Sequence, residues 1–129
     1  MRRDYYKKAV LINLLLRNYL TYNLYDQANK LIKRAPQIDF RSNSQLARYH
    51  YYNARIQAIH FDYSDAYQSV MTAIRKAPSV GAIGFRTAST KLAIIVQLLM
   101  GEIPERSIFT QKGMQKQLKP YFELTRVCT

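Results

Sequence analysis

Apolar residues recur every three or four positions along most of the chain, which is the period of an α-helix. Between Asp4 and Tyr22 this spacing links Tyr5, Ala9, Ile12, Leu16, Tyr19 and Leu20. The same pattern predicts further helices over about 24–34, 44–61, 64–76, 85–100 and 115–126. No stretch alternates apolar and polar residues over six positions, so the pattern predicts an all-α fold without strands.

Proline and glycine residues mark the expected ends of these helices. Pro36 and Pro78 should end the second and fourth helices, and Gly101 the fifth. Pro104 is expected as a first-turn residue of a short turn or helix that starts over 102–105, and Pro120 either kinks the last helix or restarts it. Ser42 or Ser44 is the expected cap of the third helix.

The predicted helices form pairs that repeat. The segment LYDQA at 24–28 matches DYSDA at 62–66, with Tyr25 and Tyr63 38 residues apart, and the endings KRAP at 33–36 and RKAP at 75–78 also match. A period of this size is typical of helical solenoids, although a plain helical bundle is an open alternative. The second unit has small residues and a proline where a tetratricopeptide repeat has them. We therefore predict a right-handed solenoid in which five residues pack the repeats: Ala28, Ala54, Ala66, Ala73 and Pro78.

The third predicted helix has two apolar stripes instead of one. The first contains Ala47, Tyr51, Ala54, Ala58 and Phe61, and the second contains Tyr49, Tyr52, Ile56 and Ile59. A surface helix has a single apolar stripe, so two stripes indicate a helix between two neighbours. In the fifth helix we expect near-complete burial of Leu92, Ile95 and Leu99; their exposure would instead indicate a docking surface.

The chain is strongly basic: 20 lysines and arginines against 8 carboxylates give a formal net charge of +12. This balance indicates an acidic partner, which composition alone leaves open among nucleic acid, an anionic membrane and an acidic protein. The most apolar stretch, 92–100, is too short to span a bilayer, which takes about 20 residues. We expect no membrane partner. The single cysteine, Cys128, excludes a disulfide within the chain and a cysteine-based zinc site.

No arrangement typical of catalysis is visible, and we expect neither enzymatic activity nor a cofactor or metal. Asp62 and Asp65 lie where helix caps belong, and His50 and His60 are ten residues apart on one helix, too far to share a metal. Arg48 and Arg55 lie seven residues apart between the two stripes, with Tyr52 beside them. These three residues are the candidate partner-binding set. The alternatives are tyrosines in the core and arginines on an ordinary solvated surface.

Six segments resemble one known family, in order and over nearly the whole chain. They are NLLLRNYL at 13–20, LYDQA at 24–28, ARYHYY at 47–52, AIRKAP at 73–78, LLMGEIPER at 98–106 and LKPYF at 118–122. The family is the non-ATPase regulatory subunit 3 of the proteasome's regulatory-particle lid. The segment 98–106 is the most specific of the six, because a generic tetratricopeptide repeat does not contain it.

The resemblance implies a non-catalytic scaffold that supports degradation of ubiquitin-tagged proteins in the cytoplasm and nucleus. It implies helical repeats over 1–78 and the helical beginning of a PCI domain over 79–129, without that domain's winged helix. Family members are several times longer, so we expect this chain to correspond to the middle of such a subunit. The expected partners are other lid subunits, including a small acidic tether subunit. A basic module that binds nucleic acid in a translation or RNA-export complex is the alternative, and nucleic acid is not the expected partner.

Overall fold

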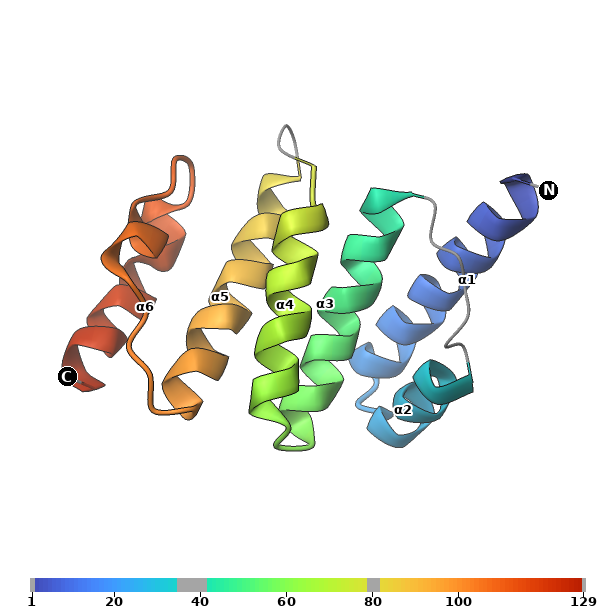
Figure 1. Ribbon diagram of the computed structural model, residues 1–129, viewed down its shortest axis with the longest axis horizontal. Helices are drawn as coiled ribbons and strands as arrows, with labels where there is room; N and C mark the ends of the chain where they lie inside the picture. The colour runs from blue at the N-terminus through green and yellow to red at the C-terminus, as the bar shows by residue number, and fades with distance from the viewer. Residues whose placement is uncertain (1, 35–41, 79–81, 129) are drawn as a thin grey trace.

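The computed structural model describes residues 2–34, 42–78 and 82–128, and within these ranges it contains helices and no strand. The helices are α1 (Arg2–Thr21), α2 (Tyr25–Arg34), α3 (Asn43–Ile59), α4 (Tyr63–Lys76), α5 (Ile83–Leu99), the 3-10 helix η1 (Arg106–Thr110) and α6 (Gln115–Cys128). They stand side by side in a row from α1 and α2 at one end to α6 at the other (Figure 1). The predicted all-α solenoid is confirmed.

Helix α3 lies inside this row and has neighbours on both sides, as its two stripes predict. It packs against α1 and α2 on one side and against α4 and α5 on the other. Ile56, from one stripe, belongs to a core cluster shared with α1 and α2, while Ala54, from the other, belongs to a cluster shared with α4 and α5. Each stripe has an exception at the end of the helix, because Ile59 and Phe61 are exposed.

The core is divided into three small clusters along the row. The first lies among α1, α2 and α3, the second among α3, α4 and α5, and the third among α5, η1 and α6. Their buried members are, in that order, Ile12, Leu16, Leu20, Ala28 and Ile56; then Ala54, Val70 and Ala93; then Ile94, Phe109, Met114 and Leu118. Successive clusters share a helix, which is the way in which a solenoid buries apolar surface.

The four alanines expected at helix contacts are fully buried: Ala28, Ala54, Ala66 and Ala73 each have no exposed surface. Their complete burial agrees with the close helix contacts that the repeat alignment predicts at these positions. Pro78, in contrast, is exposed and follows the last residue of α4 by two positions. It lies beyond the helix contact, where its ring prevents the helix from continuing. Pro36 lies outside the described residues.

The expectation for the fifth helix is wrong. Leu99 is 53% exposed, and Leu92 and Ile95 are only partly buried. The buried residues of α5 are instead Thr87, Ser89, Thr90, Ala93, Ile94 and Val96. The reason is that α5 lies between α4 and α6, so its rotation about its own axis follows the positions of those neighbours. The apolar run alone does not determine that rotation.

Ser42 and Gly101 lie at helix ends as predicted, whereas Pro104 is placed differently from the prediction and, of the two alternatives for Pro120, the restart is excluded. The Ser42 hydroxyl accepts a long hydrogen bond from the Gln45 N–H at 3.5 Å, and Gly101 has the left-handed φ of 81° expected after a helix. Pro104 is not in a helix, because η1 begins two residues later, at Arg106. Pro120 lies inside α6, which is continuous from Gln115 to Cys128, so it does not restart the helix.

Candidate functional site

A groove of about 640 Å³ lies among α1, α3 and α5. Helix α1 contributes four of its lining residues, α3 contributes three and α5 two. They are Val10, Asn13, Leu14 and Arg17; Gln45, Arg48 and Tyr52; and Phe85 and Ala88. The groove therefore combines apolar side chains with two guanidinium groups, and none of its described lining residues has a carboxylate.

The two arginines of the groove are available to a ligand. Arg17 and Arg48 are exposed, and neither guanidinium makes a hydrogen bond or an ion pair with the residues that the structure describes. Both lie near the Tyr52 hydroxyl. Burial raises the pKa of Tyr52, and the positive charges of Arg17, Arg48 and Arg55 oppose that rise. A positive field thus converges on a half-buried phenol, an arrangement suited to an anionic ligand.

An asparagine at the base of the groove links α1 to α3. Asn13 is 4% exposed, and its Nδ2 donates hydrogen bonds to the backbone oxygen of Gln45 at 2.9 Å and to Gln45 Oε1 at 2.8 Å. The other amide atom, Asn13 Oδ1, is buried without a hydrogen-bond partner among the described residues. A buried acceptor without a partner is costly, so this oxygen offsets part of the stabilisation that the two Asn13–Gln45 hydrogen bonds give to the contact between α1 and α3.

The structure brings together two of the three predicted partner-binding residues. Arg48 and Tyr52 line the groove, whereas Arg55 lies outside its lining, half-buried, with its guanidinium carbon 5.8 Å from the centre of the Tyr51 ring. The Tyr51 ring in turn meets Phe85 edge-on at 5.5 Å, so this tyrosine packs between helices. No described carboxylate pairs with either arginine, and Asp39 lies outside the described residues.

Two polar residues of α1 that line the groove were not among the residues predicted from the sequence. Arg17 and Asn13 lie on α1, about 30 residues before their neighbours on α3. The only local signal was a polar residue within the apolar pattern of the first helix. Their position opposite Arg48 and Gln45 depends on how α1 packs against α3, and the hydrophobic period carries no such information.

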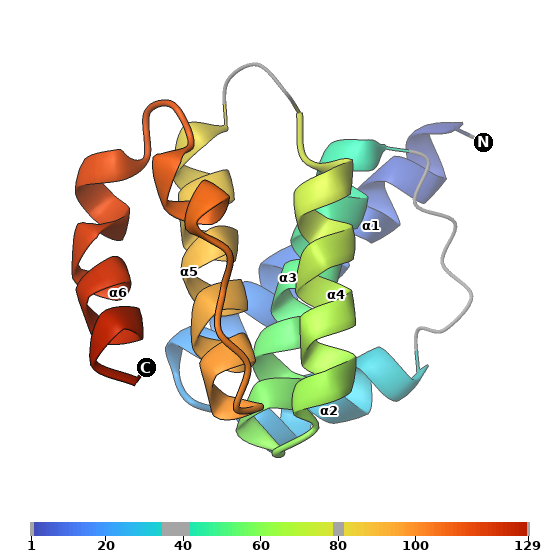
Figure 2. The same cartoon turned by 60° about the vertical axis from the view of Figure 1, so that its left-hand side comes forward.

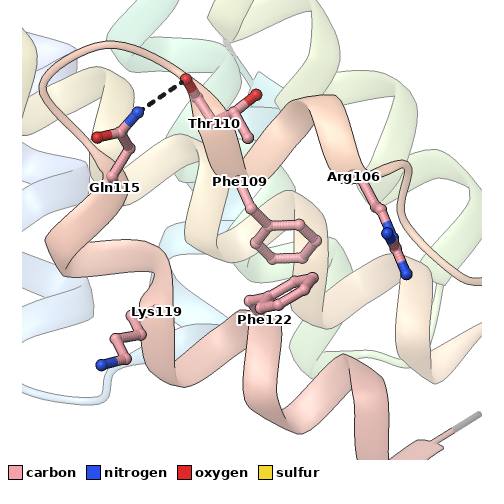
Figure 3. A pocket seen from close by; sticks show the side chains of 6 residues that line it. All are labelled: Arg106, Phe109, Thr110, Gln115, Lys119 and Phe122. Atoms are coloured by element: carbon pink, nitrogen blue, oxygen red, sulfur yellow. Dashed lines mark hydrogen bonds between the residues drawn. The ribbon is translucent and has the colours of Figure 1, made fainter.

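A smaller pocket of about 240 Å³ lies between η1 and α6. Its floor is formed by the rings of Phe109 and Phe122, whose centroids are 5.1 Å apart, and Arg106 and Lys119 lie on opposite sides of them (Figure 3). Gln115 Nε2 donates to the backbone oxygen of Thr110 at 3.4 Å across one end. Phe109 belongs to the third core cluster, so this pocket is mainly a gap in the packing of the last helix.

The histidines do not form a site. His60 Nδ1 lies 2.8 Å from the backbone oxygen of Ile56, and the ring of His50 packs edge-on against Tyr49 at 5.9 Å. Burial, with a smaller effect from the Lys76 charge, lowers the pKa of His50 below its ordinary value of 6.5. Among the residues that can be described, no three His, Cys, Asp or Glu side chains lie close enough to hold a metal ion. None of the helices there is both long and apolar enough to cross a bilayer.

Comparison with known proteins places this arrangement in a family. Residues 1–125 match the family model described as "PSMD3-like, N-terminal TPR repeats". The chain is 58% identical over 125 residues to the 26S proteasome non-ATPase regulatory subunit 3 homolog B of Arabidopsis thaliana. It is 50% identical over 126 residues to the probable 26S proteasome non-ATPase regulatory subunit 3 of Drosophila melanogaster. It is 53% identical over 118 residues to the corresponding subunit of Dictyostelium discoideum.

These matches cover 97%, 98% and 92% of the chain but only 26%, 26% and 23% of the relatives. The chain thus spans about a quarter of the length of the curated relatives it matches. Its repeated helix pairs correspond to the tetratricopeptide repeats named in the family description. Because the family model covers nearly the whole chain, this protein belongs to the family of PSMD3-like proteins and has the helical repeats of their N-terminal part.

Proposed function

We propose that this chain is a non-catalytic scaffold segment of the proteasome regulatory-particle lid, which supports ubiquitin-dependent protein degradation through contacts with other lid subunits. The observation that carries the proposal is identity of 50–58% to proteasome regulatory subunits along nearly the whole chain. The fold agrees with it, because a row of helices with several small clusters offers long surfaces for partners. The cytoplasm and nucleus are the expected compartments.

Within this proposal, the groove among α1, α3 and α5 is the binding site for an acidic segment of a small tether subunit. Arg17 and Arg48 would pair with its carboxylates, because both are exposed and line the groove. Leu14 and Phe85 offer apolar contacts between these polar groups. Charged pairs of this kind mainly accelerate association and select the partner, while the apolar contacts extend the lifetime of the complex.

The scaffold role is tested by co-expressing the tagged chain with the other subunits of a regulatory-particle lid. Copurification of defined lid subunits in fixed stoichiometry supports it. A folded chain that captures none of them would contradict it.

The groove is tested with the double variant Arg17→Glu, Arg48→Glu. The purified acidic tether subunit is the probe, and its association rate is measured at several salt concentrations. We expect slower association with a flatter salt dependence. The matched control is Lys30→Glu, Lys33→Glu, which changes the net charge equally on exposed residues of α2 outside the groove. Equal behaviour of the two double variants would exclude the groove as the site.

The same assay distinguishes the nucleic-acid alternative. A single-stranded RNA that binds with an affinity falling steeply with salt, at a slope matching several phosphate contacts, would favour that alternative. A tether that binds through carboxylates and apolar anchors together should depend less steeply on salt.

The division into helical repeats over 1–78 and the helical beginning of a PCI domain over 79–129 is part of the same proposal. Helix α4 packs directly against α5 across this point, so the two parts share core contacts. Hydrogen exchange with different opening free energies on the two sides of residue 78 would support the division. A single opening free energy for both parts would contradict it.

A further inference from the structure

Exposed apolar side chains gather along one edge of the solenoid. The α1–α2 turn, the α3–α4 turn and the α5–η1 turn all lie at this edge, the lower one in both views (Figures 1 and 2). We call their segments 21–27, 59–66 and 98–104 the turn edge. Its exposed large apolar residues, with their exposed fractions, are Tyr22 (68%), Leu24 (38%), Ile59 (39%), Phe61 (77%), Leu99 (53%) and Ile103 (55%).

The turn edge also differs in charge from the rest of the molecule. None of the 20 lysines and arginines lies in its three segments, although the chain has a net charge of +12. Four of the 8 carboxylates lie there, namely Asp26, Asp62, Asp65 and Glu102. All four are exposed. The turn edge is therefore an acidic and apolar strip on a basic protein.

Helix dipoles explain only part of this distribution. Asp26 and Asp65 lie in the first turns of α2 and α4, where a negative charge is favourable. The same edge holds the C-terminal ends of α1, α3 and α5, where a positive charge would be favourable, and none of these ends has one. At the opposite ends of α2 and α4 the basic residues are present, as Lys33 with Arg34 and Arg75 with Lys76. The absence of bases from the turn edge thus needs another cause.

Phe61 is the most unusual residue of this edge. It has a left-handed backbone with φ of 66°, a conformation that is unfavourable for a bulky residue because its Cβ crowds the following carbonyl oxygen. The equivalent turns have Asn23 and Gly101 in this conformation, which are residue types that adopt it readily. Phe61 buries little surface, since 77% of it is exposed, and Tyr63, at 6.3 Å, is the one aromatic ring that it meets among the described residues. A strained residue that holds an aromatic ring in solvent indicates a role outside the chain.

We propose that the turn edge docks against a folded protein surface that is apolar at its centre and basic at its rim. Aromatic and aliphatic anchors surrounded by opposite charges are the usual anatomy of a protein interface. Charge complementarity decides the class of partner, because the four carboxylates would repel nucleic acid and an anionic membrane alike. The proposal rests on the proposed function, which makes the partner another subunit of the regulatory particle.

Carbodiimide crosslinking tests the contact directly, because it joins a carboxylate to a lysine amine that touches it. The tagged chain is co-expressed with the other lid subunits, and the purified complex is crosslinked and analysed by mass spectrometry. We expect links from Asp62, Asp65 or Glu102 to lysines of one other subunit. Links only between two copies of this chain would overturn the proposal, as would links made only by carboxylates outside the turn edge. A chain that joins no lid subunit would remove the proposed function and this inference together.

Substituting the exposed rings of the turn edge distinguishes an effect on docking from an effect on folding. The double variant Tyr22→Asn, Phe61→Asn removes the two most exposed rings of the turn edge, and asparagine tolerates the left-handed backbone at 61. We expect a melting temperature of the isolated chain that is unchanged or higher, together with at least about a fivefold loss of copurifying lid subunits, since interface aromatic residues are common hot spots.

The matched control is Tyr6→Asn, which removes a ring of similar exposure from the other end of α1. It should leave copurification unchanged. Equal copurification by the double variant, the control and the native chain would overturn the docking role while leaving the scaffold function intact. A double variant that loses thermal stability would show that the two rings support the fold, contrary to the proposal.

Discussion

Replacing Ala66 by leucine tests whether α3 and α4 approach as closely as the repeat alignment requires. Ala66 lies near the start of α4 and has no exposed surface, and Val70, one turn further, is also fully buried. Ala54 of α3 and Ala73 of α4 are equally buried, so small side chains line this contact along both helices. The substitution adds three carbon atoms where only a methyl group is present.

The sign of the effect distinguishes a tight contact from a loose one. If space were available, three additional buried carbons would stabilise the fold by about 2 kcal/mol, at about 0.8 kcal/mol each. If the helices are in contact, the leucine must separate them or adopt a strained rotamer, which costs about 1–3 kcal/mol. The zero exposure at Ala66 favours the second case. For a chain of this length the expected fall in melting temperature is roughly 4–12 °C, at about 4 °C per kcal/mol.

Thermal and urea unfolding, followed by circular dichroism, measure this effect. The matched control is Gln68→Leu, two residues further on α4, where the same side chain enters an exposed position. The control should change the free energy of unfolding by no more than about 0.5 kcal/mol. An Ala66→Leu variant that melts with its control, or above the native chain, would refute the close approach of α3 and α4.

Three further outcomes are expected. Asn13→Ala removes both hydrogen bonds to Gln45 and leaves buried acceptors unpaired, so the free energy of unfolding in urea should fall by about 2–4 kcal/mol. A fall of less than about 0.5 kcal/mol would contradict the link between α1 and α3. Ile94→Ala should lower the free energy of unfolding by about 2–5 kcal/mol because Ile94 is fully buried, whereas Leu99→Ala should leave it nearly unchanged. Similar losses for both variants would contradict the observed rotation of α5. The lowered pKa of His50 means that the unfolded chain binds a proton more readily than the folded one. The contribution of neutral His50 to the free energy of unfolding should therefore be fully present above pH 6.5 and be lost as the pH falls below this value. In melting curves measured at several pH values, His50→Asn should remove the part of the pH dependence that comes from this histidine.

Much of the fold followed from local patterns. The helical period located the α-helices of the described residues to within a few residues, because the spacing of apolar residues reflects which side of each helix is covered. The buried alanines were found for a similar reason, since a small residue at a repeated position indicates a close helix contact. The two stripes of α3 correctly indicated a helix with neighbours on both sides.

The α-helices and the family could thus be read from the amino-acid sequence, since they depend on local spacing and on residue identity, whereas the structure was needed to show that the helices form a row and not a plain bundle. The buried side of α5 could be known only from the packed helices, because Ala93, Ile94 and Val96 are covered by neighbours whose positions no local pattern encodes. Only the tertiary structure could place Arg17 opposite Arg48 across the groove. Only it brought three turns from distant parts of the chain to one edge. Contacts between distant segments depend on how whole helices are placed relative to one another. The spacing of apolar residues in one helix does not determine how its neighbours are rotated.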